Sequence, residues 1–348
     1  MPSKNHANAH LALQTALVLA VAGTASGAFA ATAETADHAV WQQVIHDNPA
    51  PSQGCFHATY PSAIWVKDQC RPTPRRFVTP PRPTTTFGKG QVVGNGNDYS
   101  IGVRGTISQT VGSFPLAYNV QSEYSDGGIA GPNEYTLQIN SQFGEGTAIC
   151  NNIPYCLAWQ QFIYSPDYAV DGSAAVFMQY WLIWYGYDGR SCPDGWWTYG
   201  PHCYTNSDYV SAPDVPITQL GSEKLSGSAR VGGNDTVTFT LGNTAYSISA
   251  PDSKVGLGSW WNASEFNVVG NAGGSQAVFN DGAFLMTNVA VKATSTAKPQ
   301  CLVNAGTTGE TNNLNLGPCA AYSAAMPFIR FSQSLPVGGG GGGGGGEN

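Results

Sequence analysis

Two long apolar segments, residues 158–165 and 175–185, constrain the fold of this chain more than any other feature. β-Branched and aromatic residues dominate both segments, which is typical of β-strands. A Pro-Asp pair and an Asp-Gly pair lie between them and predict a turn region. The sequence therefore predicts a long hairpin. Because aromatic residues occupy both faces of its second arm, either both faces are covered or one face lines an aromatic cleft.

Two adjacent glutamines, Gln160 and Gln161, lie inside the first arm. Side chains of a strand alternate between its two faces, so these two glutamines must point in opposite directions. If the sheet packs on a second sheet, the outward face is the one that carries function. One glutamine is therefore a candidate for that face.

The composition favours an all-β fold. Turn signals recur about every ten residues along a chain with 43 glycines, which suits a sandwich or a barrel. Charged residues make up 11% of the chain, against about 25% in an average globular protein. Few lysines and arginines and a net charge of −7 argue against binding to nucleic acid or to anionic membranes. The low charge also suits an acidic working environment.

Four segments are predicted. Residues 1–30 have the layout of a secretory signal peptide, with an apolar run that is too short to span a membrane. Residues 31–90 form a proline-rich leader that encloses one cysteine pair, and it is either a mobile arm or a pro-segment that covers the active face until it is removed. Residues 91–336 form the β-domain, and residues 337–348 a disordered glycine-rich tail. We therefore expect a secreted, extracellular protein without a membrane span.

Eight cysteines suit disulfides in an oxidising compartment. Zinc is the competing interpretation, but the chain has no C-x-x-C pair and few nearby histidines. We therefore expect neither a metal nor a cofactor. Spacing alone favours pairing between sequence neighbours: Cys55 with Cys70, Cys150 with Cys156, Cys192 with Cys203, and Cys301 with Cys319.

Three segments together resemble a known family. Residues 159–164 carry glutamine on a strand, residues 181–185 carry W-x-x-W-Y, and residues 263–268 carry an Ala-x-Glu-aromatic-x-Val element. This order resembles the glutamic peptidases of the eqolisin type and is similar to the neprosin-like secreted proteins. The resemblance implies an antiparallel two-sheet sandwich, a concanavalin-like jelly roll, with catalysis on its concave face. The chain departs from the eqolisin pattern where that family has further acidic residues, for example at Ile183.

The resemblance also implies a pair of site residues, Gln161 or Gln160 together with Glu265. Chemically, hydrolysis of a protein or peptide substrate needs a base for water, which a partly desolvated carboxylate supplies. A carboxamide N–H can hold the developing oxyanion without titrating. We therefore expect Glu265 to be the base and Gln161 the more suitable oxyanion donor. The walls of the cleft are assigned to aromatic residues: Trp159, Trp181, Trp184 and Tyr185.

Two other functions compete with the peptidase. A secreted binding module can use aromatic rings to stack on sugars and amides to bind their hydroxyls, which would make a polysaccharide the partner. A glycosidase would need two facing carboxylates, and Glu265 is the one strand-borne acid that the sequence nominates. A protein with no catalytic role is the third alternative. The residues of the sugar-binding face would be Gln160, Trp181, Trp184, Trp196, Trp197 and Tyr199.

Overall fold

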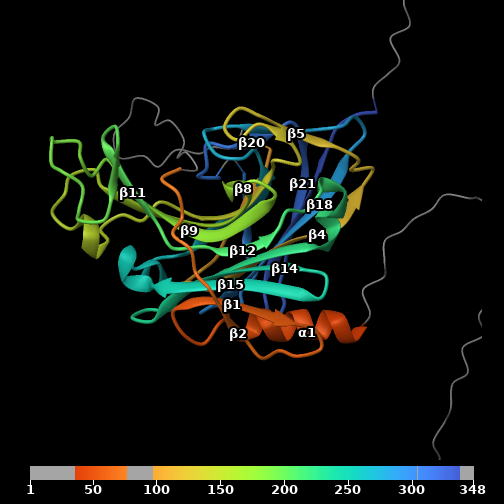
Figure 1. Ribbon diagram of the computed structural model, residues 1–348, viewed down its shortest axis with the longest axis horizontal. Helices are drawn as coiled ribbons and strands as arrows, with labels where there is room; N and C mark the ends of the chain where they lie inside the picture. The colour runs from red at the N-terminus through yellow and green to blue at the C-terminus, as the bar shows by residue number, and fades with distance from the viewer. Residues whose placement is uncertain (1–35, 77–96, 304, 338–348) are drawn as a thin grey trace, which may run out of the picture. The chain divides into compact units, whose positions relative to one another are not determined.

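Two large antiparallel sheets form most of the computed structural model (Figure 1), which describes residues 36–76, 97–303 and 305–337. The first sheet has the strand order β2-β1-β15-β14-β13-β4-β18-β22-β21. Its strands are β1 (Gly54–Thr59), β2 (Val66–Asp68), β4 (Ile107–Tyr118), β13 (Glu223–Ser228), β14 (Asn234–Leu241), β15 (Thr244–Pro251), β18 (Phe284–Ala293), β21 (Asn315–Tyr322) and β22 (Phe328–Ser334).

The second sheet carries the predicted site and has the order β10-β11-β9-β8-β7-β16-β3-β19, with β12 also paired to β9. Its strands are β3 (Tyr99–Gly102), β7 (Thr136–Ser141), β8 (Leu157–Val170), β9 (Ser173–Ile183), β10 (Trp197–Tyr199), β11 (His202–Asn206), β12 (Val210–Pro213), β16 (Ala263–Val269) and β19 (Gln300–Val303). A small third sheet joins β5 (Glu123–Asp126), β6 (Gly131–Pro132), β17 (Gln276–Phe279) and β20 (Thr311–Asn312).

Helices are short in the described part of the chain. The one α-helix found there is α1 (Ala36–Asp47), and the 3₁₀ turns are Ala148–Cys150, Ile217–Ser222, Asp252–Lys254 and Leu257–Ser259. None of the helices in these residues is both long and apolar enough to cross a membrane.

The two large sheets pack face to face, and glycines in the first sheet make room for aromatic rings from the second. A Cβ atom added at Gly112 of β4 would lie 2.1 Å from the Phe266 ring, and one added at Gly227 of β13 would lie 2.4 Å from the Phe162 ring. Both phenylalanines are fully buried. The all-β sandwich expected from the sequence is therefore confirmed.

The predicted hairpin is formed by β8 and β9, with Gln161 opposite Gln179. Its turn is the Asp-Gly pair, because β8 continues through the Pro-Asp pair with an irregular register and ends at Val170. At the other end, β9 stops at Ile183, earlier than the expected residue 185. Trp184 has a φ of 61°, which breaks the extended conformation and takes Trp184 and Tyr185 out of the strand.

Residues 36–76 are the described part of the expected leader, and they belong to the same compact unit as the sandwich. Strand β1 pairs with β15 at the edge of the first sheet, and Trp41 and Ile45 of α1 are buried in a small core next to it. These residues thus extend the sandwich. The boundary at residue 90, the signal peptide 1–30 and most of the tail lie outside the described residues.

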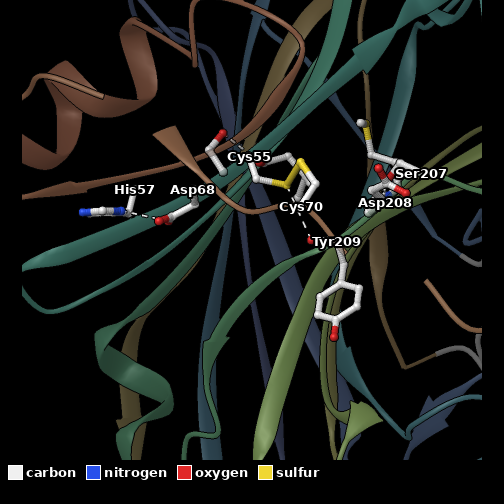
Figure 2. Close-up of a disulfide and its surroundings, with 10 residues drawn as sticks. Cys55, His57, Asp68, Cys70, Ser207, Asp208 and Tyr209 are labelled. Atoms are coloured by element: carbon white, nitrogen blue, oxygen red, sulfur yellow. Dashed lines mark hydrogen bonds and ion pairs between the residues drawn. A yellow bond between two sulfur atoms is a disulfide. The ribbon is translucent and has the colours of Figure 1, made fainter. Parts of the chain in front are cut away.

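All four expected disulfides are present: Cys55–Cys70, Cys150–Cys156, Cys192–Cys203 and Cys301–Cys319. Figure 2 shows the first of them beside the backbone of Tyr209, whose carbonyl oxygen is 3.5 Å from Cys55 Sγ. This bridge fixes the point at which the leader leaves the first sheet and reaches the second. Four disulfides are consistent with an extracellular protein.

Candidate functional site

A row of polar side chains crosses the second sheet on the face turned away from the first sheet. Strand pairing places Glu265 opposite Asn140, Asn140 opposite Gln161, and Gln161 opposite Gln179. Asn206 is opposite Gln179 and completes the row on β11. Directly paired residues share a face, so five strands bring these side chains together. We call these five residues the polar row.

Hydrogen bonds connect the polar row from the glutamate to the glutamines. Asn140 Nδ2 donates to Glu265 Oε2 at 3.2 Å, and Gln161 Nε2 donates to Asn140 Oδ1 at 3.0 Å. The Gln161 amide also lies 3.4 Å from Gln138 Oε1. The structure therefore links Gln161 and Glu265 through Asn140, although one strand separates them.

The two adjacent glutamines are separated by the sheet. Gln160 is opposite Tyr180 and points into the sandwich, where it interacts with Asp235 of the first sheet. Gln161 lies on the opposite face, which it shares with Glu265. The geometry therefore places Gln161 near the glutamate and removes Gln160 from the site.

Glu265 is buried beside a second acid, Asp98, which the sequence did not nominate. Burial raises the pKa of Glu265 well above its ordinary value, and the neighbouring Asp98 carboxyl raises it further. Burial also raises the pKa of Asp98, which accepts a hydrogen bond from Asn267 at 3.2 Å. Apart from the interaction between the two carboxyl groups, Oε1 of Glu265 and Oδ1 of Asp98 have no hydrogen-bond partner among the described residues. Two such carboxyls are expected to share a proton.

A connecting segment covers the glutamate. The Thr307 backbone N–H donates to Glu265 Oε2 at 2.8 Å, and its hydroxyl donates to the Ser141 carbonyl at 2.7 Å. The Trp159 indole donates to the same hydroxyl at 2.9 Å. Glu265 is 1% exposed and Gln161 0%. Solvent therefore does not reach these two side chains in this structure.

The other end of the polar row is covered by residues 71–76, which we call the strap. Arg71 and Tyr209 exchange backbone hydrogen bonds of 3.1 and 2.8 Å. Further along, the Asn206 amide donates to the Pro74 carbonyl at 3.0 Å, and the Gln179 amide donates to the Arg76 carbonyl at 3.3 Å. The sheet face thus holds the strap through its backbone oxygens.

A row of aromatic side chains runs beside the polar row. Trp197 is opposite Tyr204, Tyr204 opposite Trp181, and Trp181 opposite Trp159. Trp159 and Trp181 are fully buried. They lie on the same face as Gln161, and in this structure they pack against each other and against the covering segments.

Trp184 and Tyr185 have different surroundings from the ones expected. The Trp184 backbone N–H donates to His202 Nδ1 at 3.0 Å, and the two rings lie 4.8 Å apart. Tyr185 is partly buried beside Arg190. Burial lowers the pKa of His202 to about 4, which agrees with a neutral ring that accepts this bond.

Sequence reasoning missed most of the polar row. Alternating amides in an apolar strand, Gln138 and Asn140, were an available signal, and so was Gln179 in the aromatic arm. Asp98 carried no such signal, because it precedes a short strand. Among the described residues, no group of three or more His, Cys, Asp or Glu side chains is arranged to hold a metal.

No protein-family model matches the chain, and no curated protein matches it. Among solved structures, SCP-B, a member of the eqolisin family of peptidases in a complex with the tripeptide Ala-Ile-His, is 12% identical with a TM-score of 0.29, covering 68% of this chain and 96% of SCP-B. Scytalido-glutamic peptidase with a transition state analog inhibitor is 12% identical with a TM-score of 0.33, covering 69% of this chain and 98% of that one. Likeness at this level assigns no function.

Proposed function

We propose that this protein is a secreted, acid-acting endopeptidase of the glutamic type. Glu265 is the general base and Gln161 the oxyanion donor. The observation that carries the proposal is the hydrogen-bonded link from Glu265 through Asn140 to Gln161, on a face that also binds backbone carbonyls of the strap. The raised pKa of Glu265 supports a role in proton transfer.

In the proposed reaction, the Glu265 carboxylate takes a proton from water, and the oxygen of that water bonds to the carbonyl carbon of the scissile peptide. The carbonyl oxygen becomes an oxyanion, which the Gln161 amide N–H stabilises. When the carbon–nitrogen bond breaks, Glu265 returns the proton to the leaving amine. Asn140 positions both groups. Its hydrogen bond to Glu265 favours the ionised form that starts the reaction.

The proposal includes an inactive state, because substrate cannot reach a buried pair. The strap covers Gln179 and Asn206 by accepting hydrogen bonds from both. We propose that the leader is a pro-segment whose removal or displacement uncovers the Gln179 and Asn206 end of the polar row, and that the segment around Thr307 moves as well to uncover Glu265. Water then reaches Glu265, and its pKa falls because burial no longer raises it. The carboxylate therefore forms at mildly acidic pH.

The test compares matched variants in a cleavage assay. The full-length protein, before and after limited proteolysis, is incubated with an unfolded protein substrate between about pH 3 and pH 7. We expect Glu265→Gln to abolish cleavage and Gln161→Met to lower kcat about 100- to 1000-fold, as for loss of an oxyanion donor. Gln160→Met is the control, because it changes the neighbouring glutamine on the opposite face.

Cleavage that persists in Glu265→Gln, with the fold intact by circular dichroism, would rule out this mechanism. Equal losses in Gln160→Met and Gln161→Met would rule out the role of Gln161. If no form of the wild-type protein cleaves the substrate at any pH, the peptidase proposal fails and the sugar-binding module becomes the better account.

A further inference from the structure

Arg75 of the strap lies over the ring of Trp197. Its guanidinium carbon is 5.1 Å from the ring centroid, within the range of a cation–π interaction. Trp197 is the outermost member of the aromatic row and remains partly exposed. The aromatic row therefore ends in a ring that accepts a positively charged side chain.

Trp197 is held firmly enough to act as a platform. Strand β10 pairs with β11, and the Trp197 ring contacts the Tyr204 ring with centroids 5.2 Å apart. The Cys192–Cys203 disulfide closes the loop that leads into β10. The Thr205 hydroxyl donates to the Gly195 carbonyl at 3.0 Å and fixes the same loop. A pre-ordered ring loses little entropy when a ligand binds.

The backbone of the strap is anchored at Arg75 and at the residue before it. The Tyr204 hydroxyl donates to the Arg75 carbonyl at 3.3 Å, and the Asn206 amide donates to the Pro74 carbonyl at 3.0 Å. Carbonyl oxygens are common to all peptides, so these bonds accept any sequence. The side chain over Trp197 is where the face distinguishes one peptide from another.

We propose that Trp197 is a subsite for an arginine or lysine side chain of a peptide bound along this face, and that Arg75 occupies it in this chain. That this peptide is a substrate rests on the proposed function. That Trp197 binds an arginine or lysine side chain does not depend on it. The net charge of −7 favours a cationic ligand as well.

The first experiment is a double-mutant cycle in the full-length protein. Its readout is hydrogen exchange of the Tyr209 amide, which donates to the Arg71 carbonyl and is released when the strap lifts. We expect Arg75→Ala and Trp197→Ala each to speed exchange about two- to fivefold. The double variant should be no faster than the single ones. Arg75→Lys should keep most of the protection, and Arg75→Met should lose it.

The control is Arg76→Ala, which removes the same type of exposed side chain one residue away without a described ring beneath it. The subsite proposal fails if Arg76→Ala has the same effect as Arg75→Ala, or if the effects of Arg75→Ala and Trp197→Ala simply add.

The second experiment asks whether the vacated ring binds a ligand. N-acetyl-arginine methylamide is titrated into the wild type, Arg75→Ala, and Arg75→Ala/Trp197→Ala, and the indole N–H signals are followed by NMR. We expect saturable shifts in Arg75→Ala alone. Equal shifts in all three proteins, or none in Arg75→Ala, would overturn the proposal. Neither experiment needs peptide cleavage, so failure here is distinct from failure of the peptidase proposal.

Discussion

Replacing Glu223 with glutamine should make the stability of this protein less sensitive to pH. Burial raises the pKa of Glu223 from 4.5 to about 8. The Tyr135 hydroxyl has two acceptors in reach, the Val215 carbonyl at 2.9 Å and Glu223 Oε1 at 2.5 Å, but only one hydrogen to donate. A protonated Glu223 can donate to the tyrosine oxygen, which leaves the tyrosine hydrogen for Val215. The structure therefore fits the neutral acid.

The sign of the effect follows from proton binding. Between pH 4.5 and 8 the folded protein keeps the Glu223 proton that the unfolded chain has lost. Stability from this group is complete below pH 4.5 and falls by about 1.4 kcal/mol per pH unit as the pH rises. From pH 4.5 to 8, the contribution of Glu223 to the free energy of unfolding falls by about 5 kcal/mol in total. Glutamine carries an N–H in place of the acid proton and does not titrate.

The assay is urea unfolding at pH 4.5, 6, 7 and 8. We expect Glu223→Gln to match the wild type at pH 4.5 within about 1 kcal/mol and to exceed it by several kcal/mol at pH 8. Glu145→Gln, which alters an exposed carboxyl group, should follow the wild type throughout. If the difference between Glu223→Gln and the wild type is the same at all four pH values, the argument from burial is refuted.

Two further substitutions test the core. Burial lowers the pKa of His46 to about 4, with Nδ1 3.0 Å from the Ser226 hydroxyl, so stability from this group is lost as the pH falls below 6.5. His46→Gln should therefore lessen the loss of stability between pH 6.5 and 4 by about 1.4 kcal/mol per pH unit, which urea unfolding measures. Gly112→Ala places a Cβ 2.1 Å from the Phe266 ring and should lower the free energy of unfolding by about 1–3 kcal/mol. Gly221→Ala, whose nearest contact is at 3.7 Å, is its control in thermal unfolding, and equal shifts would contradict the packing argument.

The hairpin could be predicted from the sequence because its signal is local. Apolar runs and an Asp-Gly turn specify two paired strands whatever lies around them. The ends of the strands depend on tertiary contacts. Trp184 leaves the strand to bond its backbone to His202, a residue 18 positions away. No pattern within residues 175–185 indicates this contact.

The choice between Gln160 and Gln161 shows where sequence reasoning stops. Alternation predicts that they face opposite ways, but which one faces outward depends on the register with β7 and β9. That register is visible only when Asn140 and Gln179 are seen opposite Gln161. Asp98 is harder still, because its closeness to Glu265 comes from pairing between strands far apart in the chain.

The buried acids indicate the conditions in which this fold is most stable. Burial raises the pKa of Glu123 and Glu134 to about 8, as it does that of Glu223. His46 and His202, whose pKa values burial lowers to about 4, act in the opposite direction. The histidines contribute their full stability above pH 6.5 and cause no further change there, whereas the contribution of the three acids continues to fall up to pH 8. The combined contribution of these five groups to stability therefore falls between neutral and alkaline pH and favours the acidic range, in which a glutamate can exchange protons with water.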